Sequence, residues 1–296
     1  MNYICFDIGG TVTKYAVVNN RYEILIKSDF PTEINKGATF LLTRMIQRIE
    51  TWKKSYSVAG VAIASPGIVD CERGVVTFAN ERGKEFEGID YKKSILNATD
   101  LACWAENDAN CFALAETLHN DCDFLTITVG TGIGGAIMIN GNVYHGINNS
   151  AGAFGQMRIS DTEKWEEAAS VRNLIETAKK NNLQVASGEE LFSLYDKKNS
   201  TAQQIIAAFY HSLALGIVNL AYIFSPPKII VGGGITNRPA FHHELTAAVK
   251  KIAHPAYFGK TEIAISRYKN NGGFIGALVN FQNKSKNRCN LNIDKV

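Results

Sequence analysis

An acid, Asp108, lies between two asparagines in the segment 106–110, ENDAN, directly after the apolar run 101–105. A carboxylate where a strand ends and a helix begins can face a cleft and accept a proton from a substrate hydroxyl. An unperturbed aspartate, with a pKa of about 3.9, is ionised at neutral pH and could act as such a base. The alternative is that Asp108 or Asn107 only caps the helix expected over 111–118.

The segment 125–135, LTITVGTGIGG, could bind a phosphate group. Its apolar residues and threonines suit a half-buried strand, and the glycines that follow let backbone N–H groups approach an anion. Thr131 adds a hydroxyl donor. The same order of strand and glycines recurs at 3–11, YICFDIGGT, and at 229–235, IIVGGGI. Three unrelated hairpin turns are the alternative, but they would leave the recurrence unexplained.

The first of these turns also carries an acid. Asp7 lies where the strand ends, so its carboxylate could hold a hydrated cation such as Mg²⁺. If this acid turn faced the Thr131 turn, the two would hold a metal-bound polyphosphate from both sides.

Two other positions are candidates for ligand contact. The buried strand predicted over 58–64 ends in Ser65, Pro66 and Gly67, where proline restricts the turn and glycine permits close approach of a ligand. A plain turn is the alternative. Asn80 follows Phe78 and Ala79 and is the one polar side chain of that stretch that could reach inward.

Composition indicates a globular enzyme-sized chain. The 296 residues and 32.5 kDa suffice for two modest domains, and 46% hydrophobic with 20% charged residues is ordinary. The net charge of +3 is spread along the chain, which argues against nucleic acid as a partner. Six cysteines without a CxxC pair indicate reduced thiols and a cytoplasmic location. The apolar stretch 213–224 is too short to span a bilayer, so we expect no membrane partner.

Hydrophobic periodicity predicts a mixed α/β chain. The expected strands are one that ends at Asp7 and those at 12–18, 22–27, 58–64, 101–105, 125–129, 136–139, 143–144, 228–231 and 262–265. The expected helices are 36–54, 111–118, 189–197, 201–224, 239–252 and 273–281. The order strand, hairpin, helix, strand, helix occurs twice, which indicates two related lobes. We expect them at 1–118, completed by the helix 273–284, and at 119–272, with 285–296 as a polar tail.

Taken together, four motifs resemble the ROK family (repressor, open reading frame, kinase) of sugar kinases over essentially the whole chain. They are DIGGT at 7–11, ENDANCFALAE at 106–116, TVGTGIGGAIMING at 128–141, and GGGI with the downstream NNGGFIGAL at 270–278. The resemblance implies the duplicated ribonuclease-H-like, actin-like ATPase fold, with sugar and Mg-ATP in a cleft between two lobes. Some members carry a winged helix ahead of this region. This chain starts at the first strand, so we expect no DNA-binding module.

The resemblance also implies a role for each matching residue. Asp108 matches the catalytic base and Asn107 a sugar ligand. The remaining matches are Asp7, Gly9, Gly10 and Thr11 in the first phosphate loop, with Asp7 holding Mg²⁺ through water; Thr131, Gly132 and Gly134 in the second; Gly233 and Gly234 in the adenosine-side turn; and Ser65, Gly67 and Asn80 in the sugar pocket.

Two departures from the family pattern bear on the sugar site. The family motif GExGH reads GAFGQ at 152–156, and the cysteine-rich zinc loop CxCGxxGCxE is absent, so we expect no zinc. Ala153 replaces a sugar-binding glutamate, which is expected to loosen or redirect sugar recognition. Gln156 can still exchange hydrogen bonds with a sugar hydroxyl. Glu166, in KWEEAAS, lies near the later acidic ligand of the family, and a solvated acid at a helix start is the alternative.

The resulting hypothesis is an ATP- and Mg-dependent kinase that phosphorylates a primary hydroxyl of a hexose or hexose derivative. Zinc-less β-glucoside kinases, glucokinases and N-acetylmannosamine kinases are the similar groups. The alternative, suggested by Ala153, is a catalytically weak or inactive sugar-binding protein that acts as a sensor. Retention of Asp7, Asp108 and the Thr131 turn favours the enzyme. Dimers are usual in the family, so a homodimer is expected.

Overall fold

The computed structural model of the chain describes residues 1–120 and 123–293. Contacts divide the chain into two compact units. The first comprises Met1–Asn120, Gly146–Ser150 and the described part of Asn271–Val296, and the second comprises the described part of Asp121–His145 together with Ala151–Asn270. The domain boundaries expected at 118/119 and 272/273 stay a prediction.

The first unit is built on a five-stranded sheet. Its elements are β1 (Asn2–Ile8), β2 (Val12–Asn19), β3 (Ile24–Pro31), α1 (Ala38–Lys53), β4 (Val58–Ser65), β5 (Ile68–Asp70), β6 (Val75–Phe78), α2 (Tyr91–Thr99), β7 (Cys103–Asn107), α3 (Asp108–Glu116) and α10 (Gly272–Ile293). The strand order is β3-β2-β1-β4-β7. Strands β1, β4 and β7 run parallel to one another, β2 is antiparallel to β1, and β3 is antiparallel to β2. The carboxyl ends of β1, β4 and β7 therefore meet at one edge.

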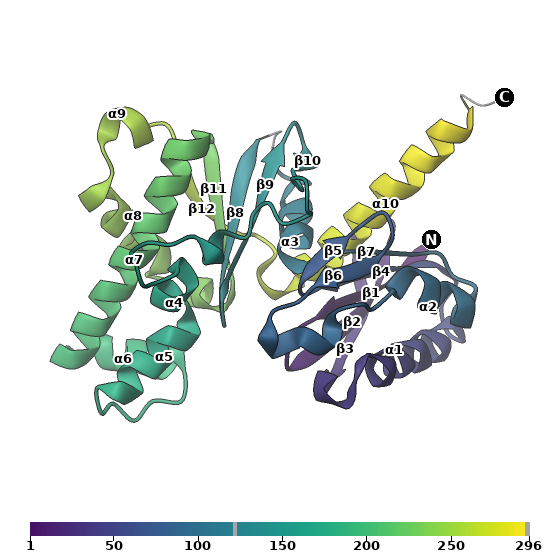
Figure 1. The fold of residues 1–296 in the computed structure, drawn as a ribbon, viewed down its shortest axis with the longest axis horizontal. Coiled ribbons are helices and arrows are strands. Elements are labelled where there is room, and N and C mark those ends of the chain that lie inside the picture. The colour runs from purple at the N-terminus through teal and green to yellow at the C-terminus, as the bar shows by residue number, and fades with distance from the viewer. Residues whose placement is uncertain (121–122, 294–296) are drawn as a thin grey trace. The chain divides into compact units, whose positions relative to one another are not determined.

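Alternation along β1 sorts its side chains onto the two faces of this sheet. Ile4, Phe6 and Ile8 join a buried cluster with apolar residues of α1 and α2. On the opposite face lie α3 and α10 (Figure 1), and Phe281 of α10 packs against Tyr3 with ring centroids 5.1 Å apart. The sheet is thus covered on both faces, which explains the nearly unbroken burial of β1 and β4.

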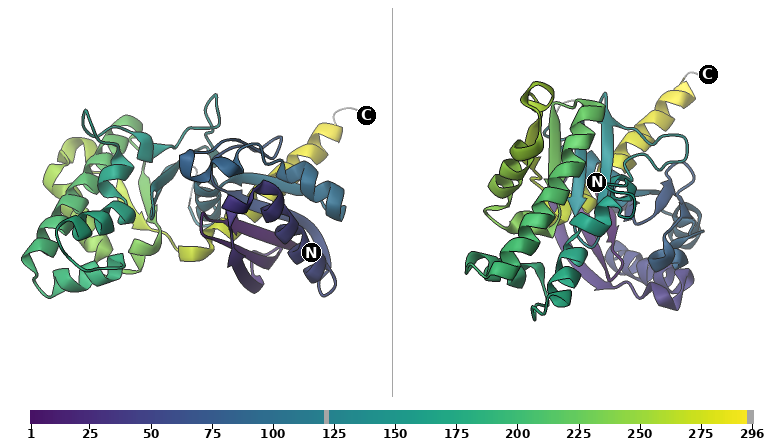
Figure 2. Two further views of the ribbon diagram at one scale, coloured as in Figure 1. Left: turned by 60° about the horizontal axis from the view of Figure 1, so that its bottom comes forward. Right: turned by 60° about the vertical axis from the view of Figure 1, so that its left-hand side comes forward.

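The second unit repeats this arrangement of strands. Its elements are β8 (Phe124–Val129), β9 (Ile133–Ile139), β10 (Asn142–Val143), α4 (Trp165–Ala169), α5 (Val171–Lys180), α6 (Gly188–Asp196), α7 (Ser200–Phe224), β11 (Lys228–Gly232), α8 (Phe241–Ile252), α9 (Pro255–Phe258) and β12 (Glu262–Ile265). The order β10-β9-β8-β11-β12 and the strand directions match those of the first sheet. The helices gather beside the sheet in each view of Figure 2 and share one core with Leu125, Ile127 and Val129.

Several elements differ from the sequence prediction. Strands β5 and β6 and helices α2, α4, α5 and α9 were not expected, and α10 continues to Ile293, past residue 284, where the sequence predicts a polar tail. The expected frayed tail is therefore wrong for 285–293, and 294–296 lie outside the described residues. Among the cysteines, Cys5, Cys71, Cys103 and Cys111 are buried thiols, and the side chains of Cys122 and Cys289 are not described.

Helix α7, expected over 201–224, begins one residue earlier, at Ser200. Its 25 residues, with a mean hydropathy of 1.6 over the most apolar window, are long and apolar enough to cross a membrane by length and composition alone. In the structure 61% of that window is buried within the protein, and α7 contributes many side chains to the core of the second unit. We therefore interpret α7 as a core helix, although the expected reason, insufficient length, was wrong.

The contact between α4 and α7 depends on one glycine. Trp165 of α4 is fully buried, and its Nε1 donates to the Ser212 carbonyl oxygen at 2.9 Å. A Cβ placed on Gly216 of α7 would lie 2.0 Å from Trp165 Cε2. The indole therefore occupies the space that a side chain at position 216 would need.

We expect Gly216→Ala to lower the free energy of unfolding by about 1–3 kcal/mol, because the added methyl group overpacks the Trp165 site. Helix propensity alone predicts the opposite sign, a gain of up to about 1 kcal/mol. Urea denaturation distinguishes the two. Ala207→Gly, at an exposed position of α7, calibrates the propensity effect in the same helix. A stabilised Gly216→Ala variant would contradict the packing argument.

Candidate active site

The side chain of Asn107 joins three parts of the first unit. It is the N-cap of α3, and its Oδ1 accepts from the backbone N–H groups of Ala109 at 2.9 Å and Asn110 at 3.1 Å. Its Nδ2 donates to the Gly67 carbonyl oxygen at 2.8 Å and to Asp108 Oδ1 at 3.0 Å. Asn107, rather than Asp108, therefore caps the helix, and Asp108 is left to present its carboxylate.

Asp108 is an exposed carboxylate with an altered affinity for protons. Its Oδ1 accepts from Asn107 and from the Ala109 N–H, and no hydrogen bond to Oδ2 is found within residues 1–120 and 123–293. Desolvation by the surrounding protein and the charge of Asp7 raise the pKa of Asp108 from 3.8 to about 6, against the lowering effect of these hydrogen bonds. Accessible surface and desolvation differ in what they measure, because an accessible oxygen can still be surrounded by protein. At pH 7 the carboxylate is mostly ionised.

The turn between β1 and β2 is held by hydrogen bonds within the first unit. The Gly9 N–H donates to the Val12 carbonyl oxygen at 3.0 Å, and a Cβ on Gly9 would lie 2.9 Å from that oxygen. The buried Thr32 hydroxyl donates to the Gly9 carbonyl oxygen at 2.7 Å. Gly10 and Thr11 are exposed at the tip of the turn. The turn thus offers backbone groups at a fixed position, which suits an anion.

Asp7 lies beside the start of α10. A Cβ on Gly273 would be 2.6 Å from Asp7 Cγ, and one on Gly276 would be 1.6 Å from the Cys111 carbonyl oxygen. These glycines let α10 approach both Asp7 and α3, which accounts for the glycines of the segment NNGGFIGAL. Desolvation raises the pKa of Asp7, and Lys14 opposes this change.

Sequence reasoning missed Lys14. Its Nζ lies 3.8 Å from Asp7 Oδ2, and it stands opposite Asp7 in the register of β1 and β2. The sequence could have indicated this contact. Residues 7 and 14 are equally far from the centre of the glycine turn, so a hairpin places them opposite each other. A cation here could neutralise part of the charge of a phosphate group.

A divalent cation suits this part of the first unit. Asp7 and Asp108 each have a raised pKa, and the charge of Asp7 contributes to that of Asp108. Carboxylate oxygens with water are the ligands that Mg²⁺ prefers. A cation held by Asp7 would offset the repulsion between the carboxylates of Asp7 and Asp108.

The three residues expected in the sugar pocket differ in their surroundings. Ser65 is fully buried, with its hydroxyl 3.1 Å from the Tyr91 hydroxyl and from the Pro66 carbonyl oxygen. Gly67 has φ +91°, and a Cβ there would lie 2.6 Å from the Phe78 carbonyl oxygen, so the position requires glycine. Asn80 is exposed and precedes a short helical turn. The Ser65 hydroxyl is therefore directed into the core.

In the second unit, the Gly130 turn between β8 and β9 takes the place that the Gly9 turn has in the first. The Gly130 N–H donates to the Gly132 carbonyl oxygen at 3.0 Å, and its carbonyl oxygen accepts from the Val171 N–H at 2.9 Å. Thr131 is exposed, and Gly134 lies within β9. At the end of β11, Gly233 has φ +101°, and a Cβ there would lie 2.2 Å from the Val129 carbonyl oxygen.

A cavity of about 890 Å³ opens beside these two turns, entirely within the second unit. Its walls come from the end of β8, from α5 and α6, and from the segment after β11 that contains Gly234 and Arg238. Its size is within the range of pockets for small ligands. Sequence reasoning found the glycine turns at its rim but missed α5 and therefore one wall.

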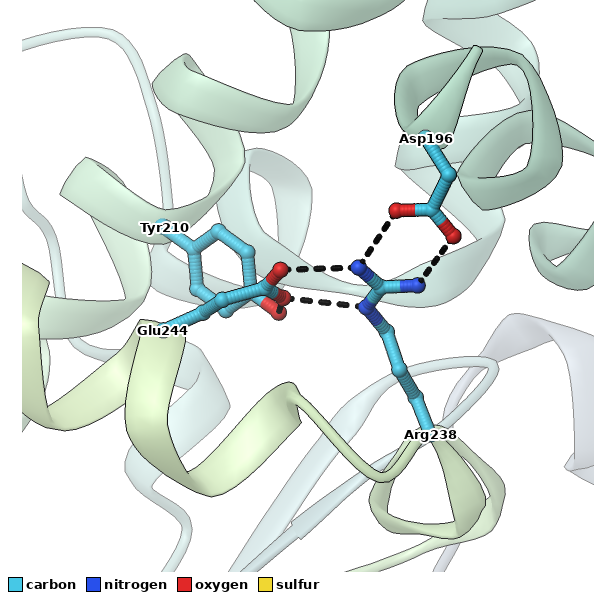
Figure 3. A network of polar contacts seen from close by, with 4 residues as sticks. All are labelled: Asp196, Tyr210, Arg238 and Glu244. Carbon is cyan, nitrogen blue, oxygen red and sulfur yellow. Dashed lines mark hydrogen bonds and ion pairs between the residues drawn. The ribbon is translucent and has the colours of Figure 1, made fainter.

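Arg238 connects the walls of this cavity (Figure 3). Its guanidinium donates to Asp196 Oδ1 and Oδ2 at 2.8 and 2.9 Å, and to Glu244 Oε1 and Oε2 at 2.7 and 3.0 Å. The Tyr210 hydroxyl donates to Glu244 Oε2 at 2.6 Å. The guanidinium carbon also lies 4.7 Å from the Phe192 ring centroid. Burial alone would raise the pKa of Glu244. The hydrogen bonds from Arg238 and Tyr210 together outweigh this effect, so the pKa of Glu244 is lowered.

Gln156 and Glu166, both expected at the sugar site, contact each other in the second unit. Gln156 Nε2 donates to Glu166 Oε1 at 2.8 Å, and Lys164 Nζ donates to Gln156 Oε1 at 2.9 Å. A Cβ on Gly132 would lie 2.7 Å from Glu166 Oε2. Glu166 is thus adjacent to the second glycine turn. Ala153 is exposed just before the short helical turn that contains Gln156.

Comparison with known proteins decides the family. A family model described as the ROK family matches residues 3–284. This chain belongs to the ROK family. The resemblance inferred from the four motifs is therefore confirmed. The roles of individual residues and the lack of a zinc site stay predictions.

Relatives of this ROK protein match over nearly their whole length. A β-glucoside kinase of Listeria innocua is 33% identical, over 95% of this chain and 97% of the relative. A glucokinase of Halalkalibacterium halodurans is 28% identical, over 97% and 98%. A solved ROK family protein of Streptococcus pneumoniae in complex with sucrose superposes with a TM-score of 0.86 at 28% identity, over 97% of this chain and 100% of that one. The expected actin-like, two-lobed α/β fold class is confirmed.

The raised pKa of Asp108 predicts that this residue destabilises the folded ROK protein at neutral pH. The folded state holds the proton more tightly than the unfolded chain, so stability is lost as the pH rises through about 6. We expect Asp108→Asn to raise the stability at pH 8 by roughly 1 kcal/mol, a value reduced for solvent exposure. The gain should shrink on acidification and vanish below pH 4. Thermal unfolding of both proteins from pH 4 to 8 checks this, and a pH-independent difference would disagree.

Proposed function

We propose that this ROK protein is an ATP-dependent sugar kinase that transfers a phosphoryl group to a hydroxyl of a hexose or hexose derivative, with β-glucosides as the first candidates. The relatives with nearly full-length matches support the enzyme class, since they are named β-glucoside kinase and glucokinase. The β-glucoside kinases share 31–33% of their residues with this chain, which supports that substrate class over glucose.

The observation that carries the proposal is the carboxylate of Asp108. Asn107 and the Ala109 N–H hold Oδ1 in place, so Oδ2 is available for a substrate hydroxyl. As the bond between the hydroxyl oxygen and the γ-phosphorus forms, the proton of that hydroxyl moves to Oδ2. The bond between the γ-phosphorus and the bridging oxygen breaks, and ADP leaves. A pKa near neutrality suits a base that must accept and then release a proton.

The negative charge of the phosphate groups must be neutralised for this reaction to proceed. Phosphoryl transfer depends mainly on positioning and charge neutralisation. In the first unit we assign these tasks to the backbone of Gly9, Gly10 and Thr11 and to the cation Lys14. Mg²⁺, held by Asp7 through water, supplies further neutralisation of the phosphates when bound. In the second unit we assign Thr131, Gly132 and Gly134.

The cavity of the second unit is the candidate site for the adenosine part of ATP. Its volume of about 890 Å³ accommodates a nucleoside, and Gly234, which lines it, has open space where a side chain would be. Gly233 lets the turn after β11 pack against the backbone at the end of β8. Arg238 and Asp196 supply a polar wall, and the ion pair with Glu244 helps to hold Arg238 in place. We propose that this network, rather than the glycines alone, shapes the nucleotide site.

The proposed sugar ligands are Asn107, Gly67 and Asn80 in the first unit and Gln156 and Glu166 in the second. The Ser65 hydroxyl bonds within the core, so we assign it a positioning role through Tyr91. Ala153 leaves one acceptor fewer than the family motif provides, which suits a substrate other than free glucose. A primary hydroxyl is the proposed acceptor. A homodimer stays a prediction, which sedimentation equilibrium of the purified chain would check. The cytoplasmic location stays a prediction as well.

The test is ATP turnover in a coupled assay with glucose, N-acetylmannosamine, N-acetylglucosamine, fructose, mannose, cellobiose and gentiobiose, each with Mg²⁺. We expect the highest kcat/KM with cellobiose or gentiobiose. Asp108→Asn should lower kcat by about 10²–10⁴-fold, because it removes the proton acceptor. Circular dichroism confirms that the variant is folded.

Two results would contradict the proposal. Unchanged phosphorylation by Asp108→Asn would exclude Asp108 as the base. Sugar binding by calorimetry without turnover of any sugar would favour the sensor alternative.

We expect Arg238→Met to raise the KM for ATP by about tenfold or more, with little effect on the KM for the sugar. The change removes a guanidinium that holds two carboxylates and leaves Glu244, whose side chain is 17% exposed, without its cation. The free energy of unfolding should fall by about 1–3 kcal/mol. Arg238→Lys should not restore ATP affinity, because an ammonium cannot bond two carboxylates in the same plane.

Lys250→Met, an exposed change on α8, is the matched control and should leave both KM values within twofold. A destabilised Arg238→Met variant with normal ATP affinity would limit the network to a structural role.

A further inference from the structure

Three polar side chains of the second unit form a chain of hydrogen bonds in a fixed direction. Lys164 Nζ donates to Gln156 Oε1 at 2.9 Å, and Gln156 Nε2 donates to Glu166 Oε1 at 2.8 Å. An ammonium group can only donate, and an ionised carboxylate can only accept. With Lys164 on one side and Glu166 on the other, only one orientation of the Gln156 amide satisfies both. Lys164 and Glu166 together determine the orientation of the Gln156 amide, and Lys164 anchors its oxygen end.

The backbone holds both ends of this chain. Lys164 is the N-cap of α4, where its N–H donates to Glu167 Oε2 at 2.9 Å. The next residue, Trp165, is fully buried, and its N–H donates to the Met157 carbonyl oxygen at 2.7 Å. That contact joins the start of α4 to the residue after Gln156. The two segments thus remain in register, and the side chains need little further ordering.

The direction of these hydrogen bonds decides which oxygen of Glu166 is occupied. Its Oε1 is occupied by Gln156, while its Oε2 is the atom nearest to a Cβ placed on Gly132. Within the described residues, no hydrogen bond to this Oε2 is found. One carboxylate oxygen is therefore held by the protein, and the other stays available beside the second glycine turn.

We propose that Lys164 is a positioning residue for the acceptor sugar, acting through Gln156 on Glu166. This inference rests on the proposed function. The cation fixes the amide, the amide fixes the carboxylate, and Glu166 Oε2 accepts a hydrogen bond from a sugar hydroxyl. Without Lys164, the Gln156 amide oxygen loses its donor, so the amide is less firmly held beside Glu166.

The experiment measures KM and kcat for Lys164→Met, Lys164→Arg and Gln156→Leu with the best sugar of the panel. Lys164→Met should raise the sugar KM by about tenfold, with kcat and the ATP KM within twofold. Lys164→Arg keeps the donor and should restore the sugar KM to within threefold. Gln156→Leu should resemble Lys164→Met, and the double variant should be no worse than either single one, because both break the same chain.

Lys251→Met, an exposed change on α8, is the control for loss of a positive charge and should match the wild type. An unchanged sugar KM in Lys164→Met overturns the proposal, as does additivity of the two single changes. Failure of Lys164→Arg to restore the sugar KM counts against it equally. If the wild-type chain phosphorylates no sugar, the proposed function and this inference both fail. Wild-type turnover with a normal Lys164→Met KM removes the positioning role alone.

Discussion

The hydrogen bonds of one amide side chain, Asn107, hold the proposed catalytic part of the first unit together. Its oxygen caps α3 and its nitrogen binds the turn after β4 and the carboxylate of Asp108. The amide oxygen accepts two hydrogen bonds and the amide nitrogen donates two, so all its positions are used. Rotation of the side chain would break these bonds. An aspartate at this position could not donate to Gly67, and a leucine would leave α3 uncapped. The position of the proposed base thus follows from the cap of a helix.

The repeated sheet topology explains why the glycine turns recur. In both units the first strand runs into a tight antiparallel hairpin, and the parallel strands beside it end at the same edge. Glycine is required where backbone approaches backbone or a side chain, as at Gly67, Gly233 and Gly276. These close approaches remove side-chain bulk at the edge of the sheet and leave main-chain groups exposed. The same edge also brings Asp7 close enough to Asp108 for its charge to raise the pKa of Asp108.

Much of the site could be predicted because it depends on patterns that are local in the chain. A strand followed by glycines, or an asparagine and an acid at a helix start, is visible within ten residues. Lys14 was missed, although the hairpin pairing with Asp7 could have indicated it. Helices α2 and α5 were missed because polar residues interrupt their short apolar stripes, and their stability depends on the helices and strands they pack against. The placement of Ser65 in the core depends on Tyr91, a residue of a helix that was not expected.

The sequence by itself determined the family, the main strands of both sheets, the glycine turns and the candidate base, because backbone conformation and hydrophobic period are set by nearby residues. Only the tertiary structure decided the chemical state of those groups. The pKa of Asp108 depends on desolvation by the surrounding protein and on Asp7, which is distant in the chain. Arg238 finds Asp196 across 42 positions, and Lys164 reaches Glu166 only through Gln156. Electrostatic and hydrogen-bonding energies depend on distances in space, which sequence spacing does not give.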